Sequence, residues 1–387
     1  MIKKWMMALC ILVVALLPAG CALEAVEDDA VRPAEETSQE EVPADPVLPE
    51  DEAEEPDTES TEIIGISDLL EEEVVEYTEY ESGHFQPVIS AINHYVIDPA
   101  TGSNMTEQDY EYYKMMIDAI LCRQESMYLV RDYDKLLYIW YLLEGSPYEF
   151  LVKKVHINNA HDTMSFEYAF DAEEHASIIE YVDREYMDIF SKCVSPEMSD
   201  LEKVLAIYRY FDYRIQYDYE WADALAASDE PYLFPDITIY EALTTSYGVC
   251  HTYSYLCEFA FLQLGIDSVE LYGTATDDSF AHMWLLVKIG DEYYHLDPTW
   301  DDQGKTASLQ YFGMTDDESY ARGVYCSDMD IREDLSEIDC TDSRFCEFRN
   351  ITSYTIPGDG KLYAHIDGED EITVITLSDY EYQSGGL

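Results

Sequence analysis

The sequence predicts an α+β fold in which one apolar helix packs on antiparallel strands. Residues 249–264 carry apolar side chains at helical spacing, between Gly248, which allows a tight turn, and Gly265, which ends a helix. Three segments with strand patterns follow at 269–274, 281–289 and 292–296. Gly290-Asp291 between the last two is typical of a hairpin turn. A helix followed by consecutive strands therefore forms the centre of the predicted fold.

Side-chain spacing indicates which faces of the two main helices are buried. In the helix at 249–264 the expected inward stripe consists of Cys250, Tyr253, Cys257, Phe261 and Leu264, with Cys257 as a core residue. A second helix is expected from Leu201 to Tyr213, capped by Ser199 and Asp200. Its apolar face contains Val204, Leu205, Tyr208 and Phe211.

The segments on either side of this centre predict smaller units. A further helix with apolar residues from Tyr110 to Ile120 should begin at Thr106, with Asp109 at capping-box spacing. Short buried elements are expected at 136–142, 152–157 and 164–170. From Phe348 the pattern alternates, with turns at 357–360 and 367–368, which predicts a three-stranded meander.

The N-terminus has the layout of an export signal. Lys3 and Lys4 precede an apolar run that ends at Leu17, and small residues lead to Cys21. Pro18-Ala-Gly-Cys21 resembles a bacterial lipobox, so Cys21 is the expected lipidation site, although Pro18 stands where such boxes usually have Leu. Simple cleavage near Ala22 is the alternative. Both predict a protein outside the cytoplasmic membrane, as a lipoprotein on its outer face or secreted.

Composition and motifs divide the chain into five parts. Residues 1–21 are the signal with its lipobox, and 22–82 form an acidic, Pro-containing linker expected to be disordered. An accessory α+β domain is predicted at 83–198 and the domain that carries the chemistry at 199–325. The remainder, 326–387, is predicted as loops and the small meander.

Charge excludes two classes of partner. The chain has 21 Lys+Arg against 82 Asp+Glu, a net charge of −61. Between Glu24 and Ser82 there are 24 acids and one base, which leaves 18 bases and 58 acids from Gly83 on, or −40. Nucleic-acid binding and polybasic attachment to anionic lipid both need the opposite sign. The acidity favours basic or neutral partners, or simply keeps the protein in solution.

The cysteines show no metal or redox motif. Of the nine, Cys10 lies in the signal and Cys21 at the lipobox, which leaves an odd number, seven, in the rest of the chain. No C-x-x-C pair occurs, so a zinc ribbon or a thioredoxin-like pair has no support. His156, His161 and His175 have no partners at ligand spacing and are interpreted as ordinary histidines. We therefore expect no metal and no cofactor.

Three residues in chain order predict thiol chemistry. Cys250 is expected at a helix N-terminus, where unsatisfied N–H groups stabilise a thiolate. His282 begins a strand and Asp297 ends the next strand of the hairpin, so the carboxylate can accept a hydrogen bond from the ring. The alternative is a core thiol, a satisfied strand histidine and a turn carboxylate.

The motifs around these residues resemble those of the transglutaminase-like, papain-like superfamily of bacteria. The matching pieces are Gly248-Val-Cys250, Ala281-His-Met-Trp284, Tyr294-His-Leu-Asp297-Pro-Thr-Trp300, Ala206-Ile-Tyr with Tyr217-Asp218-Tyr219, and Tyr311-Phe312. The resemblance covers about residues 201–312 and implies a Cys nucleophile, a His base and an Asp that orients it. Thr252-Tyr-Ser254 and Leu285 depart from the family pattern and put substrate contacts near them in doubt.

The resemblance implies an acyl-thioester on Cys250, formed from an amide and passed to an amine or to water. The backbone N–H of Cys250 would hold the oxyanion, with Tyr217 or Tyr247 as candidates for a second donor. Trp284 and Trp300 are further candidates for the pocket.

The expected function is an exported cell-surface thiol enzyme, acting on a protein or wall-peptide substrate. A cysteine peptidase or amidase with the same triad, and a non-catalytic binding or scaffold protein, are the alternatives.

Overall fold

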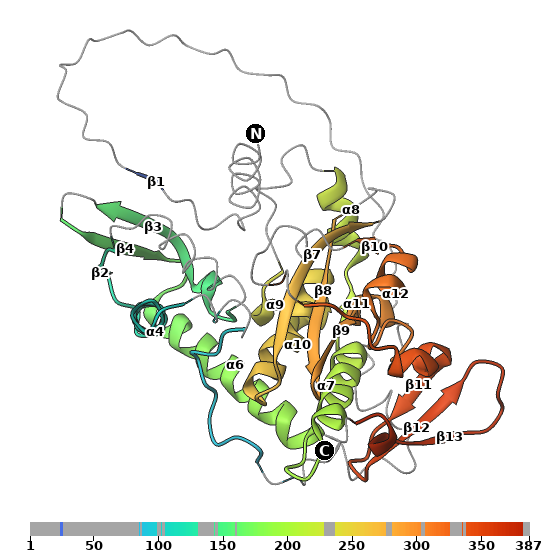
Figure 1. The fold of residues 1–387 in the computed structure, drawn as a ribbon. Coiled ribbons are helices and arrows are strands. Elements are labelled where there is room, and N and C mark those ends of the chain that lie inside the picture. Colours follow the sequence, from blue (N-terminus) through green and yellow to red (C-terminus); the bar gives the residue numbers. More distant parts are fainter. Residues whose placement is uncertain are drawn as a thin grey trace, which may run out of the picture.

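The computed structural model describes residues 24–25, 85, 87–98, 102, 105–130, 143, 146–158, 161–227, 237–275, 281–302, 306–325, 335 and 338–381 (Figure 1). The expected signal at 1–21, the lipidation site Cys21, nearly all of the linker at 22–82 and the element expected at 136–142 lie outside these residues. Within the described part, no helix combines the length and the apolar character needed to cross a bilayer.

The central sheet has the strand order β10-β7-β8-β9, and all its pairings are antiparallel. Its strands are β7 (Ser268–Ala275), β8 (Ala281–Ile289), β9 (Glu292–Leu296) and β10 (Val324–Tyr325). Gly290 has φ 67°, a conformation that glycine adopts without strain, in the turn between β8 and β9. The predicted strands and hairpin are confirmed, whereas the sequence pattern does not predict the edge strand β10.

Helix α10 (Cys250–Gln263) packs on β7 and β8 and also contacts α7 (Asp200–Arg214) and α11 (Pro298–Asp301). Both predicted long helices are confirmed to within two residues, and Ser199 caps α7 in a capping box with Glu202. The prediction that only one stripe of α10 side chains is buried is too narrow. Ten of its side chains are buried, on nearly every face, because the sheet lies on one side and helices on the others.

A second α+β layer precedes this centre. Three of its strands, β2 (Ser126–Tyr128), β3 (Val152–Asn158) and β4 (Thr163–Tyr168), pair antiparallel, and β1 (Glu24–Ala25) pairs parallel with β3. The helices are α4 (Glu107–Leu121) and α6 (Ala172–Cys193), with a short 3₁₀ turn η1 (Glu149–Leu151) before β3. Thr106 and Asp109 close the predicted capping box of α4.

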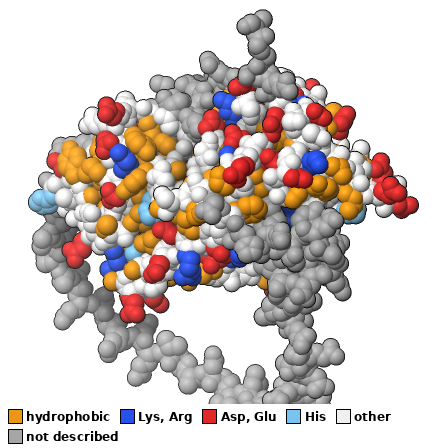
Figure 2. Space-filling view, turned by 90° about the horizontal axis from the view of Figure 1, so that it is seen from below, with side chains coloured by type: hydrophobic (Ala, Val, Ile, Leu, Met, Phe, Trp, Pro, Cys, Tyr) orange, Lys and Arg blue, Asp and Glu red, His pale blue; other side chains and the backbone are white. Residues whose placement is uncertain are grey.

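Short elements connect the layers and lie around the end of the sheet. They are α8 (Tyr219–Ala227), α9 (Ile239–Thr245), α12 (Asp316–Ala321), and the two-residue strands β5 (Gln216–Tyr217) and β6 (Tyr247–Gly248), which pair parallel. Figure 2 views the molecule from below Figure 1 and shows acidic, basic and hydrophobic side chains interspersed on that face, without a basic patch.

The C-terminal meander is confirmed as β11 (Ile351–Thr355), β12 (Lys361–Ile366) and β13 (Thr373–Thr376), flanked by the 3₁₀ turns η3 (Arg344–Asn350) and η4 (Leu377–Asp379). It is hydrogen-bonded to α7. The Arg209 guanidinium donates to the Tyr354 carbonyl (2.8 Å), and the Tyr354 hydroxyl donates to the Leu205 carbonyl (2.9 Å). One hydrophobic cluster runs from Tyr112 to Leu377, so these layers share a core.

A buried carboxyl group lies within this core. Asp212 on α7 is 1% exposed, and neither carboxylate oxygen has a hydrogen-bond partner among the described residues. Burial, and then the charges of Asp301, Asp302 and Asp297, raise the pKa of Asp212 well above its ordinary value. The folded protein therefore holds this proton more tightly than the unfolded chain does. Stability falls as the pH rises from about 4 toward the raised pKa.

We therefore expect Asp212→Asn to stabilise the protein at neutral and alkaline pH. The amide has the shape of the protonated acid and cannot ionise, so the pH-dependent loss disappears. The free energy of unfolding at pH 8 should rise by about 1 kcal/mol or more, since one pKa unit is worth about 1.4 kcal/mol. Thermal unfolding between pH 5 and 8 measures this. Asp223→Asn, at an exposed position of α8, is the control. An Asp212→Asn protein that is destabilised equally at every pH would contradict the interpretation.

Candidate functional site

The turn into α10 places the Cys250 thiol at the helix N-terminus. A Cβ on Gly248 would lie 2.9 Å from the Thr252 Cβ, so only glycine fits there. Val249 is the N-cap, and its N–H donates to the Thr252 hydroxyl (3.1 Å). Thr252, which departs from the family pattern, therefore caps the N-terminus of α10. Cys250 itself is half-buried and carries a free thiol.

The other two predicted residues meet at the end of the β8–β9 hairpin. The His282 Nε2 donates to the Asp297 Oδ2 at 2.6 Å, and both side chains are buried. The second carboxylate oxygen of Asp297 accepts the Trp300 N–H (3.1 Å), because Asp297 caps α11. With Nε2 used in this way, Nδ1 is the ring nitrogen left for Cys250, whose interaction with His282 contributes to the raised pKa of the imidazole.

The electrostatics of the site favour an ion pair. Burial would raise the pKa of the Cys250 thiol, but hydrogen bonds and charge from His251 and His282 lower it to about 6. Burial would lower the pKa of His282, but Asp297, and then Cys250, raise it to about 10. Between these two values the thiolate and the imidazolium are present together. The structure thus brings Cys250, His282 and Asp297 into one site with a reactive thiol form.

Two indole rings stack on His282. The Trp300 ring centroid lies 4.8 Å from that of His282 and the Trp284 centroid 5.8 Å, each with planes 17° apart. Trp300 is half-buried, whereas Trp284 is 0% exposed. The sequence prediction of Trp284 as a pocket residue is therefore corrected. Its ring packs behind the histidine, where substrate cannot reach it.

His251 was missed by the sequence reasoning. It follows Cys250 directly, and its interaction with the thiol lowers the pKa of Cys250. Its ring packs against Trp221 of α8 (5.9 Å) and Tyr255 (6.0 Å). Neighbouring helix positions normally point in different directions, so adjacency in sequence was no signal.

The two candidate tyrosines differ in position. Tyr217 pairs with Gly248 across β5 and β6, is half-buried, and has a pKa raised to about 12 by burial and then by the charge of Cys250. Tyr247 is 46% exposed. The structure therefore favours Tyr217 over Tyr247 as the second donor near the thiol.

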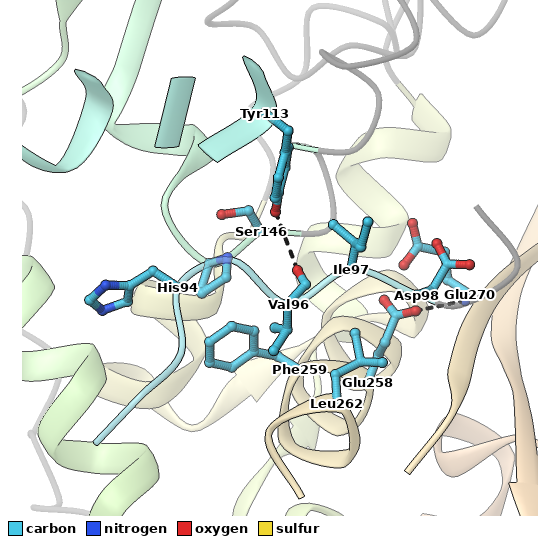
Figure 3. A pocket seen from close by; sticks show the side chains of 11 residues that line it. His94, Val96, Ile97, Asp98, Tyr113, Ser146, Glu258, Phe259, Leu262 and Glu270 are labelled. Atoms are coloured by element: carbon cyan, nitrogen blue, oxygen red, sulfur yellow. Dashed lines mark hydrogen bonds between the residues drawn. The ribbon is translucent and has the colours of Figure 1, made fainter. Parts of the chain in front are cut away.

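A pocket lies elsewhere on α10, and none of the three triad residues lines it (Figure 3). Glu258, two turns after Cys250 and so about 12 Å along the axis, faces it with Asp98 and Glu270. The Glu270 N–H donates to the Glu258 carboxylate at 3.1 Å. Burial, and then the Glu270 charge, raise the pKa of Glu258 well above its ordinary value. These acids belong to the interface with the preceding layer rather than to the thiol site.

One group of described residues could offer ligands to a metal ion. Ligand atoms of His295, Asp316 and Cys340 all lie within 4.8 Å of one another. The group lies on the sheet side behind Trp284, whose N–H reaches His295. No sequence spacing indicated it, since the three residues come from β9, α12 and a later loop.

We expect the Cys250 alkylation rate to rise through pH 6 and then to stay level, because the thiolate is the reacting form. In His282→Ala the thiol loses its main counter-ion, so at pH 6.5 the rate should fall at least about tenfold. His251→Ala should give a loss in the same direction. The measurement is the iodoacetamide rate against pH, with peptide mass spectrometry of Cys250.

Cys346, an exposed thiol, is the internal reference in each sample. Equal rates at Cys250 in the parent and in His282→Ala would show that the two side chains do not form a working pair.

Comparison with known proteins gives a match over the region that contains the triad. A family model described as a transglutaminase-like domain matches residues 164–301, a span that contains all three triad residues. One similar solved structure is described as a candidate cysteine protease from Cytophaga hutchinsonii: 17% identity, TM-score 0.23, covering 34% of this chain and 43% of that one. Another, described as a TGase, has 18% identity and TM-score 0.25, covering 40% of this chain and 45% of that one. The chain thus spans less than half of either structure.

A comparison with curated proteins finds no match. The α+β arrangement and the family match agree on the same segment, and the chain contains a transglutaminase-like domain at residues 164–301.

Proposed function

We propose that this protein is a thiol enzyme that forms an acyl-thioester on Cys250 from an amide and transfers the acyl group to an amine or to water. The observation that carries the proposal is the Cys250 thiol at a helix N-terminus, paired with His282, whose other nitrogen is bonded to Asp297 at 2.6 Å. A nucleophile, a base and an orienting carboxylate are the parts that covalent thiol catalysis requires.

In the proposed reaction the Cys250 thiolate attacks the amide carbonyl carbon and forms a tetrahedral oxyanion. The His282 imidazolium then donates its Nδ1 proton to the leaving nitrogen, the C–N bond breaks, and a thioester remains. The neutral ring next accepts a proton from the attacking amine or water. Collapse of the second tetrahedral intermediate releases the product and restores the thiolate–imidazolium pair.

The oxyanion needs donors aimed at the carbonyl oxygen. The backbone N–H of Cys250 lies in the first turn of α10, where N–H groups have no intrahelical acceptor. Tyr217, beside Gly248 and the thiol, is the proposed second donor. Burial, and then the charge of Cys250, raise the pKa of this tyrosine, so the hydroxyl keeps its proton and can donate.

The acyl acceptor separates the leading function from its closest rival. The full chain is incubated with a protein acyl donor and a fluorescent primary amine, and amine incorporation, ammonia release and peptide-bond cleavage are measured together. We expect incorporation with ammonia release, and its loss by at least about 100-fold in Cys250→Ala, because the thioester cannot form. Cys346→Ala, which removes an exposed thiol, is the matched control.

Each other result has a meaning. Cleavage without incorporation, lost in Cys250→Ala, favours the peptidase or amidase. No turnover of protein or wall-peptide donors by a chain with a reactive Cys250 favours the binding or scaffold protein.

We further propose that the protein acts at the cell surface, where the signal layout of residues 1–21 would deliver it. If Cys21 carries the lipid, Cys21→Ala should move the protein from the membrane fraction to the medium and abolish labelling with a radioactive fatty acid. Immunoblots of the two fractions measure this. Membrane retention in Cys21→Ala would point to another mode of attachment.

A further inference from the structure

A second imidazole–carboxylate pair lies behind the indole that stacks on His282. The Trp284 Nε1–H donates to the His295 Nδ1 at 2.9 Å, and the His295 Nε2 lies 2.8 Å from the Asp316 Oδ1. Trp284 and His295 are 0% and 1% exposed. Asp316, His295 and Trp284 therefore form a continuous hydrogen-bonded chain that ends at the ring against His282.

The fold holds both ends of this series of hydrogen bonds in place. On β8, Trp284 is two residues after His282, so the two side chains lie on the same side of the strand, and His295 comes from the neighbouring β9. Asp316 begins α12 and is held by Cys340 in both directions. Its backbone N–H donates to the Cys340 carbonyl (2.9 Å), and its Oδ2 accepts the Cys340 N–H (3.0 Å).

The same residues invite a metal interpretation, since His295, Asp316 and Cys340 supply three ligand atoms within 4.8 Å. The indole N–H is only a donor, so His295 Nδ1 must be an acceptor here. A neutral ring then carries its proton on Nε2, the nitrogen that faces Asp316. A metal at Nε2 would require the proton on Nδ1, opposite the indole N–H. The observed contacts favour a hydrogen-bonded chain over a metal site.

We propose that His295 and Asp316 are positioning residues for the triad, acting through Trp284. The carboxylate polarises the His295 ring, which fixes the indole plane parallel to His282 at 17°. A parallel indole favours the cationic form of the ring it stacks on. The pair would thus support the imidazolium that accompanies the Cys250 thiolate. This inference rests on the proposed function only for its effect on turnover.

The test uses the full chain with Asp316→Asn, His295→Leu and His295→Gln. Leu cannot accept the indole N–H, whereas the Gln amide oxygen can accept it and its NH₂ can donate to Asp316. Asp317→Asn is the matched control, because it removes the same charge from the next, exposed position of α12. Readouts are the pH midpoint of Cys250 alkylation, kcat and KM for the amine-incorporation assay, and the unfolding temperature.

We expect the pH midpoint of Cys250 alkylation to move up by about half a pH unit or more in Asp316→Asn and in His295→Leu. A shift of this size corresponds to weaker stacking of the Trp284 indole on the His282 imidazolium. kcat should fall about three- to tenfold with KM little changed. His295→Gln should restore most of both values, and Asp317→Asn should match the parent. A shift in the midpoint without any turnover in the parent would support the positioning role while removing the proposed function.

Two results would overturn the proposal. In the first, Asp316→Asn and His295→Leu unfold at lower temperature but keep the parent midpoint and kcat, so the pair only stabilises the fold. In the second, added Zn²⁺ shifts the parent midpoint and a chelator reverses the shift, while Cys340→Ser is insensitive to both, so the three side chains bind metal.

Discussion

The buried hydrogen bond between His282 and Asp297 is the interaction on which the rest of the site depends. Four hydrogen bonds hold Asp297. Its carboxylate accepts from the His282 ring and the Trp300 N–H, its own N–H donates to the Tyr311 carbonyl, and its carbonyl accepts the Asp301 N–H. The β8–β9 hairpin aligns the two residues, and α11 begins where the carboxylate caps it. This orientation of the His282 ring leaves Nδ1 for the thiol. The pairing of β8 with β9 therefore sets the orientation that the base needs.

The Cys250 thiolate and the His282 imidazolium must form within a strongly acidic protein. A net charge of −61 opposes any thiolate, and Asp301 and Asp302 lie in the same region of the core as Asp297. The charges of distant acids are screened over about 8 Å of salt solution, whereas those of buried neighbours are screened much less. The thiol is therefore governed by the two imidazoles beside it and by the helix N-terminus. The acidity affects which partners approach, more than whether the thiol ionises.

The sequence predicted the parts of the fold that are encoded locally. Helix caps, a glycine turn and apolar periodicity located α7, α10 and the β8–β9 hairpin, and motif order brought Cys250, His282 and Asp297 together. It could not predict contacts set by packing between distant segments. The burial of Trp284, the effect of His251 on the thiol and the His295–Asp316 pair depend on side-chain directions that spacing does not specify. Two-residue strands such as β5 and β10 are too short to leave a pattern.

The contacts between α7 and the C-terminal meander bear on the order in which the chain folds. The matched segment ends at residue 301, yet Leu205 and Arg209 inside it bond Tyr354, and Glu202 accepts the Gly360 N–H at 2.8 Å. A chain synthesised from its N-terminus leaves these groups of α7 without their partners until residue 360 has been added. The helix that carries Cys250, α10, packs on α7, so the support of the thiol site extends to the C-terminal meander. The outer face of α7 is therefore covered only after the final strands have been synthesised.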